Sequence, residues 1–142
     1  MNNLSFHITD IMTNSIRAKA SEIGLFIEER DLRITIRIAD NGLGMDAGTI
    51  ARVTNPFYTT RTTRKVGLGI PFLIQNAEQT GGAVSITSQP GKGTVVTASF
   101  CSNHIDCPPW GDLPGTVAML ITGNPDINIC FEYQAVKTAV SY

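Results

Sequence analysis

Charged residues are scarce in this sequence, and long apolar runs are missing from it. Only 16% of the 142 residues are charged and the formal net charge is -1, which argues against a general attraction to nucleic acid or to an anionic membrane. No apolar run approaches the roughly 20 residues that span a bilayer. The first ten residues also lack the basic and apolar regions of a secretion signal. We therefore expect a cytoplasmic protein that binds neither nucleic acid nor membrane.

Cysteine is also scarce, with three residues near the end of the chain. An odd number without a secretion signal suggests reduced thiols. Cys101, His104 and Cys107 could be drawn as three ligands of a metal, but their spacing matches none of the common zinc patterns. We favour small thiols and a surface histidine over a metal site.

Acidic residues are absent between positions 47 and 77, although cations are not. The protein is nearly neutral overall, so this stretch stands out as a local segment that attracts anions. Its four cations are Arg52, Arg61, Arg64 and Lys65.

Apolar periodicity predicts one domain with an α+β two-layer sandwich, in which helices cover one face of a mixed β-sheet. We expect residues 1–102 to form its core and residues 103–142 to be an α/β extension of the same domain. Asp112 is the expected N-cap of a helix in that extension. The expected helices cover residues 4–20, 46–53, 69–80 and 112–121, and the expected strands 23–27, 32–40, 83–89, 94–101 and 127–133.

Asp40 is the residue that points most directly to a function. It keeps the parity of Ile34, Ile36 and Ile38, so its side chain should face the buried side of the sheet at the end of a strand. A buried carboxylate needs a partner, and the exocyclic amine of adenine is a suitable donor. A carboxylate that caps the following turn or helix is the alternative.

Glycines follow both Asp40 and the cationic loop. Gly42 and Gly44 come directly after Asp40, and Gly67 and Gly69 flank Leu68 after the loop. Glycine lets backbone N–H groups approach a ligand closely, and a helix that begins at Gly69 has free N–H groups that can bind phosphate. Two such glycine pairs, one behind an acid and one behind cations, favour a nucleotide site.

The first helix has a polar side that carries His7, Asp10, Asn14 and Arg17. Nucleoside triphosphates are handled with Mg²⁺, which takes hard oxygen ligands, and the amide oxygen of Asn14 could be one of them. Asp10 lies one turn earlier and could orient or deprotonate a water molecule or an acceptor hydroxyl. Taken singly, both residues are also compatible with solvated positions.

Together these motifs resemble the Bergerat-fold ATPases, which include histidine kinases, gyrase B subunits, heat-shock chaperones and mismatch-repair proteins. The resemblance covers about residues 4–101 in five ordered segments. Asp10 to Ala18 resembles the N box, and Asp40 to Met45 the first glycine box. The start of the ATP lid, the second glycine box and the terminal glycine box correspond to Asn55 to Thr60, Val66 to Ile70 and Gly91 to Thr94.

The resemblance implies that the protein uses ATP and Mg²⁺. Asn14 would hold the metal, and Asp40 would bind the adenine amine with Thr94 close by and Gly42 and Gly44 behind it. Asp10 would be the catalytic residue. The phosphates would be covered by Thr60, Arg61, Arg64, Lys65, Gly67, Leu68 and Gly69.

Two departures from the family pattern bear on the activity. Asp10 stands where the ATPase members carry Glu as general base, so efficient hydrolysis is in doubt, and Arg17 stands where gyrase-like members often have an acid. The second departure favours the kinase side. We therefore expect a histidine-kinase-like or anti-sigma-factor-like protein that transfers phosphate in trans to a partner protein in bacterial signalling. The alternative is an ATP-gated regulatory module or slow ATPase without kinase activity. The identity of the partner and the oligomeric state stay open.

Two other nucleotide motifs are excluded. Gly42 to Ala47 fits a dinucleotide fingerprint, but the acid expected about 20 residues further on is missing. Gly91 and Lys92 lack the upstream glycine and the following Ser or Thr of a P-loop.

Overall fold

The structure is a computed structural model, and it describes residues 3–55 and 69–136 of the chain. This part of the chain contains both helices and strands, several of them in consecutive pairs. In chain order they are α1 (Leu4–Arg17), β1 (Glu22–Arg30), β2 (Arg33–Asp40), α2 (Ala47–Val53), α3 (Gly69–Gln79), β3 (Ala83–Gln89), β4 (Gly93–Cys101), α4 (Leu113–Gly123) and β5 (Asn128–Val136).

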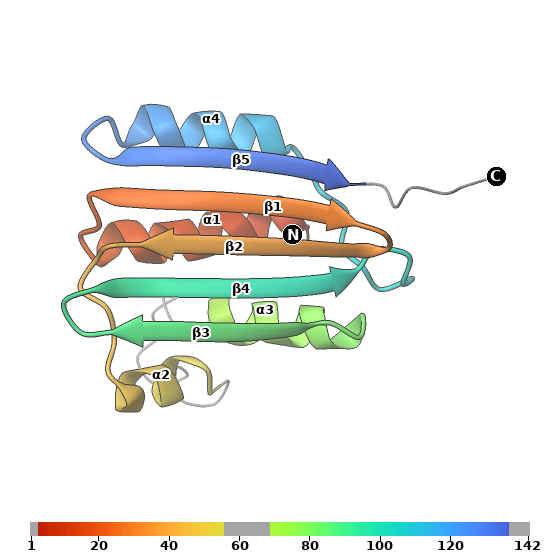
Figure 1. Cartoon of the computed structure of the whole chain (residues 1–142), viewed down its shortest axis with the longest axis horizontal. Helices are drawn as coiled ribbons and strands as arrows, with labels where there is room; N and C mark the ends of the chain where they lie inside the picture. The colour runs from red at the N-terminus through yellow and green to blue at the C-terminus, as the bar shows by residue number, and fades with distance from the viewer. Residues whose placement is uncertain (1–2, 56–68, 137–142) are drawn as a thin grey trace.

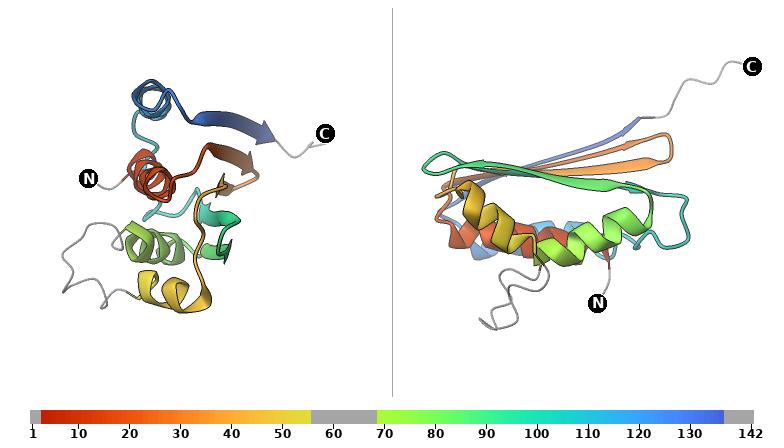
Figure 2. Two further views of the ribbon diagram at one scale, coloured as in Figure 1. Left: turned by 90° about the vertical axis from the view of Figure 1, so that its left-hand side faces the viewer. Right: turned by 90° about the horizontal axis from the view of Figure 1, so that it is seen from below.

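The strands form one mixed sheet in the order β3-β4-β2-β1-β5. Neighbouring strands run antiparallel except β5, which runs parallel to β1 (Figure 1). The helices lie on one face of this sheet (Figure 2). The predicted α+β two-layer sandwich is therefore confirmed. No helix in the described part of the chain is long and apolar enough to cross a membrane.

The core lies between the sheet and the helices α1 and α3. Period-two alternation turns one side of each central strand toward the helices, and each buried Leu or Ile side chain contributes about 1.5–3 kcal/mol. Leu4, Ile8, Ile11 and Met12 of α1 pack against this face of the sheet. The buried strand residues include Ile23, Leu25, Ile27, Ile34, Ile36, Ile38, Val96, Ala98 and Phe100.

Helix α1 ends at Arg17, three residues before the predicted end at residue 20. Lys19 adopts a left-handed conformation with φ of 64°, which stops a helix. The carbonyl of Ala18 then accepts a hydrogen bond from the N–H of Leu43 at 2.8 Å. The C-terminal end of α1 is thereby tied to the loop that follows β2.

The sequence placed His7 on the polar side of α1, but in the structure His7 is only 2% exposed. Helix α3 packs beside α1 and covers it: the ring of Phe72 lies 5.1 Å from the imidazole, and Asn76 Nδ2 lies 2.7 Å from His7 Nε2. No described residue forms a hydrogen bond with His7 Nδ1. Burial lowers the pKa of His7 to about 4, because a charged imidazole is poorly solvated there.

The first hairpin turns later than the sequence predicted. A turn at residues 29–31 was expected, but β1 continues to Arg30, which pairs with Arg33. Asp31 takes the left-handed conformation with φ of 56°, which permits a two-residue turn. Leu32 was expected in the second strand and is instead 59% exposed in this turn. Backbone pairing of β1 with β2 therefore continues beyond Ile27, the last residue of the expected first strand.

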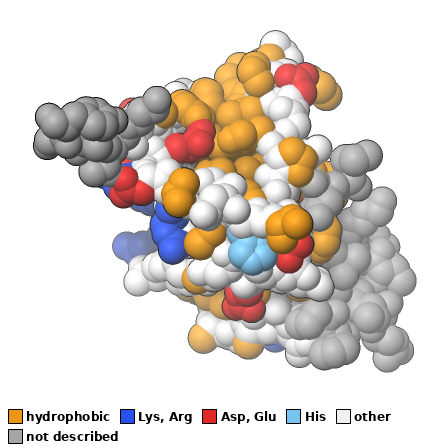
Figure 3. All heavy atoms as spheres, turned by 90° about the vertical axis from the view of Figure 1, so that its right-hand side faces the viewer, with side chains coloured by type: hydrophobic (Ala, Val, Ile, Leu, Met, Phe, Trp, Pro, Cys, Tyr) orange, Lys and Arg blue, Asp and Glu red, His pale blue; other side chains and the backbone are white. Residues whose placement is uncertain are grey.

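The C-terminal segment is joined to α1 and to the sheet. The carbonyl of Trp110 accepts hydrogen bonds from the N–H and the hydroxyl of Ser5, and α4 packs beside α1. Asp112 caps α4 as predicted, since its Oδ1 accepts from the N–H of Gly115. These contacts support the proposal that residues 103–142 extend the same domain. Figure 3 shows hydrophobic side chains gathered at the end where β1 and β5 finish.

The buried His7 makes stability depend on pH. In the unfolded chain a histidine takes up a proton near pH 6.5, whereas in the folded protein His7 does so only near pH 4. Protonation between these values favours the unfolded state. The free energy of unfolding should therefore fall as the pH drops from about 7 to about 4, by at most about 3 kcal/mol from this residue.

Urea unfolding at several pH values between about 4.5 and 7.5 measures this slope. His7→Gln should flatten it, whereas His104→Gln, on an exposed turn, should leave it as in the wild type. An unchanged slope in His7→Gln would contradict the assignment.

Candidate functional site

Three polar side chains form a row across one end of the core face. Asp40 at the end of β2 pairs with Thr94 of β4, and Thr94 pairs with Ser88 of β3. The row before it is apolar and consists of Ile38, Val96 and Ile86. The core face thus changes from apolar to polar within one step of the strand alternation.

Both carboxylate oxygens of Asp40 have a donor inside the protein. Ser15 of α1 donates its hydroxyl to Oδ2 at 2.6 Å, and the N–H of Gly42 donates to Oδ1 at 2.8 Å. The bond from Gly42 is the turn-capping contact that the sequence left open as an alternative. Each oxygen keeps a further lone pair, so these two bonds orient the carboxylate and still allow it to accept from a ligand.

At two glycines near the end of β2, the backbones of neighbouring chain segments approach each other closely. Gly44 and Gly93 have positive φ of 72° and 125°. A Cβ on Gly44 would overlap the carbonyl of Gln89, and one on Gly93 would overlap the carbonyl of Asp40. The β3–β4 turn also binds this loop, since the N–H of Gly91 donates to the carbonyl of Leu43 at 2.6 Å. The glycines are therefore required by packing within the protein itself.

A pocket of about 280 Å³ opens above this row, between α1, α2, α3 and the sheet. Apolar side chains from three sides form its walls, and Asp40 and Thr94 lie at its polar end. Its lining consists of Ile11, Asn14, Ser15, Arg17, Ala18, Ile38, Asp40, Gly44, Met45, Thr49, Val53, Ile70, Thr94 and Val96.

The short helix α2 contributes one rim of the pocket through Thr49 and Val53. Asp46 caps this helix by accepting from the N–H of Thr49 at 2.7 Å. This hydrogen bond lowers the pKa of Asp46, because it stabilises the ionised carboxylate.

The structure brings four of the predicted site residues together in the pocket: Asn14, Asp40, Gly44 and Thr94. Asp10 and Gly69 pack against each other, since a Cβ on Gly69 would lie 3.1 Å from Asp10 Oδ2. Gly42 is buried against Ala18 and does not line the pocket. The remaining predicted residues, Thr60, Arg61, Arg64, Lys65, Gly67 and Leu68, lie outside the described residues.

Ser15 and Ser88 were not predicted and hold the site together. Ser15 fixes Asp40, and Ser88 Oγ accepts from the N–H of Met45 at 2.7 Å. The sequence carried a signal for each of them. Ser15 directly follows Asn14, and Ser88 continues the alternation of Val84 and Ile86 with a polar residue, as Asp40 does in β2.

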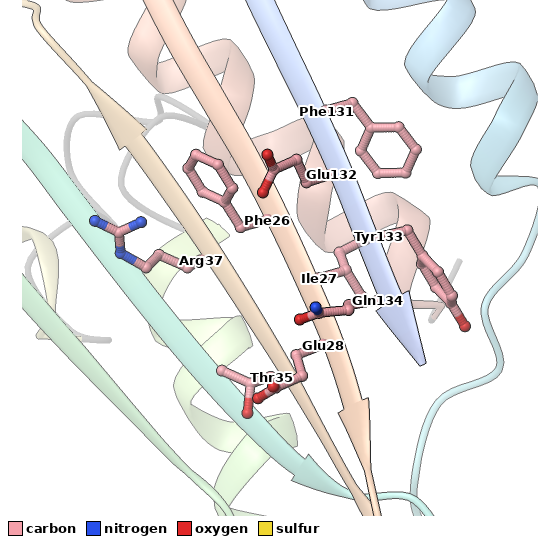
Figure 4. A pocket seen from close by; sticks show the side chains of 9 residues that line it. All are labelled: Phe26, Ile27, Glu28, Thr35, Arg37, Phe131, Glu132, Tyr133 and Gln134. Carbon is pink, nitrogen blue, oxygen red and sulfur yellow. The ribbon is translucent and has the colours of Figure 1, made fainter. Parts of the chain in front are cut away.

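A second hollow, of about 640 Å³, lies on the open face of the sheet across β2, β1 and β5. Figure 4 shows its lining side chains, among them Phe26, Arg37, Glu28 and Glu132. The guanidinium of Arg37 lies over the ring of Phe26 at 5.2 Å. None of the predicted site residues within 3–55 and 69–136 lines this hollow, so the pocket above Asp40 is the candidate site.

The candidate pocket suits a flat, mainly apolar ring that carries a hydrogen-bond donor. Aliphatic side chains form much of its lining, although Asn14, Arg17 and Thr49 also contribute, and its polar end holds a carboxylate that accepts only. Asn14 is the side chain that offers a further hard oxygen for a metal ion. In the described part of the chain no group of three or more His, Cys, Asp or Glu could hold a metal by itself.

Comparison with known proteins assigns the same region to one family. The model of the family described as "Histidine kinase-, DNA gyrase B-, and HSP90-like ATPase" matches residues 3–103. This range contains α1, the whole polar row and the pocket.

Several similar proteins are bacterial kinases. Sensor histidine kinase YxdK of Bacillus subtilis is 30% identical over 106 residues, which is 68% of this chain and 32% of that protein. Sensor protein kinase FleS of Pseudomonas aeruginosa is 35% identical over 93 residues, or 63% and 23%. Sporulation kinase E of Bacillus subtilis is 31% identical over 97 residues, or 66% and 13%. The matched part is thus a third or less of each relative's length.

Gly93, like Gly44, leaves no space for a Cβ. Gly91 and Gly93 both have positive φ, but the space around a Cβ on Gly91 is open. Gly91→Ala should therefore cost only the backbone strain, about 1 kcal/mol. Gly93→Ala should cost about 2–3 kcal/mol more, because its Cβ must displace the end of β2. Urea unfolding of both variants measures the difference, and equal losses would show that the approach is not needed.

Proposed function

The chain belongs to the family of histidine kinase-, DNA gyrase B- and HSP90-like ATPases, and we propose that it binds Mg-ATP and transfers phosphate in trans to a partner protein in bacterial signalling. The observation that carries the proposal is the carboxylate of Asp40. It stands at the polar end of an aliphatic pocket and is oriented by Ser15 and Gly42. Family membership supports ATP as the ligand.

In this proposal the adenine ring lies in the pocket with its amine toward Asp40. Ile11, Ile38 and Val96 contact the ring, which removes apolar surface from water. Thr94 lies beside Asp40 on the neighbouring strand and contacts the same edge of the base.

The triphosphate then extends from the pocket toward α1 and α3. Asn14 lines the pocket from α1, and its amide oxygen is the proposed ligand of Mg²⁺. Helix α3 begins at Gly69, where free N–H groups and the helix dipole favour phosphate. Thr60, Arg61, Arg64, Lys65, Gly67 and Leu68 remain the proposed cover of the phosphates. Asp10 packs against Gly69, which brings the proposed catalytic carboxylate next to the first residue of α3.

Transfer in trans is supported by the position of the two histidines. His7 is buried against Phe72 and Asn76, so it is closed to a phosphate donor. His104 lies beyond the far end of β4, and β4 begins beside the pocket at Thr94. At about 3.3 Å per strand residue, His104 is roughly 20 Å or more from the base site. An acceptor His or Ser outside the described residues therefore fits this site better than either histidine, and a partner protein is the proposed source.

Nucleotide binding tests the proposed roles of Asp40 and Asn14. Asp40→Asn replaces an acceptor by a donor that faces the adenine amine, so ATP affinity should fall about 10- to 100-fold. Asn14→Ala should abolish the Mg²⁺-dependent part of the affinity. Calorimetry with and without Mg²⁺ measures both effects.

Asp126→Asn and Asn103→Ala, at exposed positions away from the pocket, are the matched controls and should bind ATP like the wild type. Wild-type affinity in both site variants would remove the assignment.

A second assay separates a kinase from the alternative, which is an ATP-gated regulatory module or slow ATPase without kinase activity. Radiolabelled ATP is incubated with the protein and with candidate partner proteins. We expect label on a partner and its loss in Asp10→Asn. Tight ATP binding in which label reaches no partner would instead support the alternative.

A further inference from the structure

Ser88 is the one member of the polar row that does not line the pocket. It nevertheless contacts the loop after β2 and the first two residues of β4. Its Oγ lies 2.7 Å from the N of Met45, 2.9 Å from the carbonyl oxygen of Gly93 and 2.8 Å from Thr94 Oγ1. These three contacts use its full capacity, because a hydroxyl donates one hydrogen bond and accepts two.

The chemistry of the three partners fixes the direction of each bond. The N–H of Met45 can only donate and the carbonyl of Gly93 can only accept. The single hydrogen of Ser88 must therefore go to Gly93 if both contacts are made. Thr94 must then be the donor in its contact with Ser88. The hydrogen of the Thr94 hydroxyl is thus directed away from the pocket.

This direction decides what the pocket offers to a base. Thr94 presents only lone pairs toward the pocket, and the ionised Asp40 also accepts only. Two adjacent acceptors suit an exocyclic amine, which has two hydrogens. They disfavour a carbonyl oxygen at the same ring position, because that oxygen would face two acceptors without a hydrogen between them.

We propose that Ser88 is a positioning residue that makes the site select a 6-aminopurine over a 6-oxopurine, by orienting the hydroxyl of Thr94. The proposal rests on the proposed nucleotide site and adds to it a residue that does not touch the base. In the absence of the Ser88 hydroxyl, Thr94 is free to turn its hydrogen toward the pocket and donate to a 6-oxo group.

The test compares ATP with inosine triphosphate, which differs from ATP in the purine base alone. Calorimetry on the full chain gives the ratio of the two dissociation constants. Ser88→Ala should lower the preference for ATP about five- to tenfold, the effect of about one hydrogen bond. In a Thr94→Val background Ser88→Ala should change the preference no further, because the hydroxyl that it reorients is missing.

Two controls separate orientation from a structural role. Ser88→Thr keeps the hydroxyl and should keep the wild-type preference, as should Ser85→Ala, which is exposed on the same strand. If Ser88→Ala does not fold, Ser88→Cys keeps the size with a weaker donor and acceptor and should shift the preference in the same direction.

The outcomes are distinct. Affinities for both nucleotides that fall by the same factor in Ser88→Ala, with the preference unchanged, would overturn the inference, since Ser88 would then only fasten Met45 to Gly93. That result would leave the proposed ATP site intact. Wild-type protein that is folded and binds neither nucleotide would overturn the proposed function and, with it, this inference.

Discussion

The whole site depends on a carboxylate at the end of a central strand. Asp40 belongs to the core face of the sheet, where an ionised group is costly unless it is paired. The fold meets this cost with a hydroxyl from α1 and an N–H from the following turn. Those same bonds determine the direction of the remaining lone pairs. The stability of the fold and the proposed recognition of the base therefore both depend on how Ser15 and Gly42 orient this carboxylate.

The layered architecture brings the remaining parts of the site to the same place. The sheet supplies Asp40 and Thr94 from adjacent strands, and α1 supplies Asn14 and Ser15 from successive positions. Ser15 binds Asp40 while Asn14 lines the pocket, so one turn of α1 both orients the carboxylate and carries the proposed metal ligand. The open face of the sheet has no part in this arrangement, although it is hollowed beside Phe26.

The sequence predicted the layers and the central residues because both follow from periodicity and register. Alternation placed Asp40 on the core face, and the expected strand 94–101 contained Thr94. What it missed depends on contacts between distant segments. By its position in the sequence His7 belongs to the polar side of α1, but α3 covers it in the fold. The roles of Ser15 and Ser88 depend on contacts with Asp40 and Met45, which are distant in the sequence. The late turn after Arg30 reflects backbone pairing, which leaves no trace in side-chain patterning.

Helix α1 is held at both ends by chain segments that are far away in sequence. The carbonyl of Trp110 accepts from Ser5 near its start, and the N–H of Leu43 donates to Ala18 just after its end. A helix turns by about 100° and rises 1.5 Å with every residue. A single-residue insertion or deletion between these anchors would rotate one anchor by about 100° relative to the other, so the helix would lose either one anchor or the placement of Asn14 and Ser15. The length of α1 is therefore as strictly constrained as its composition.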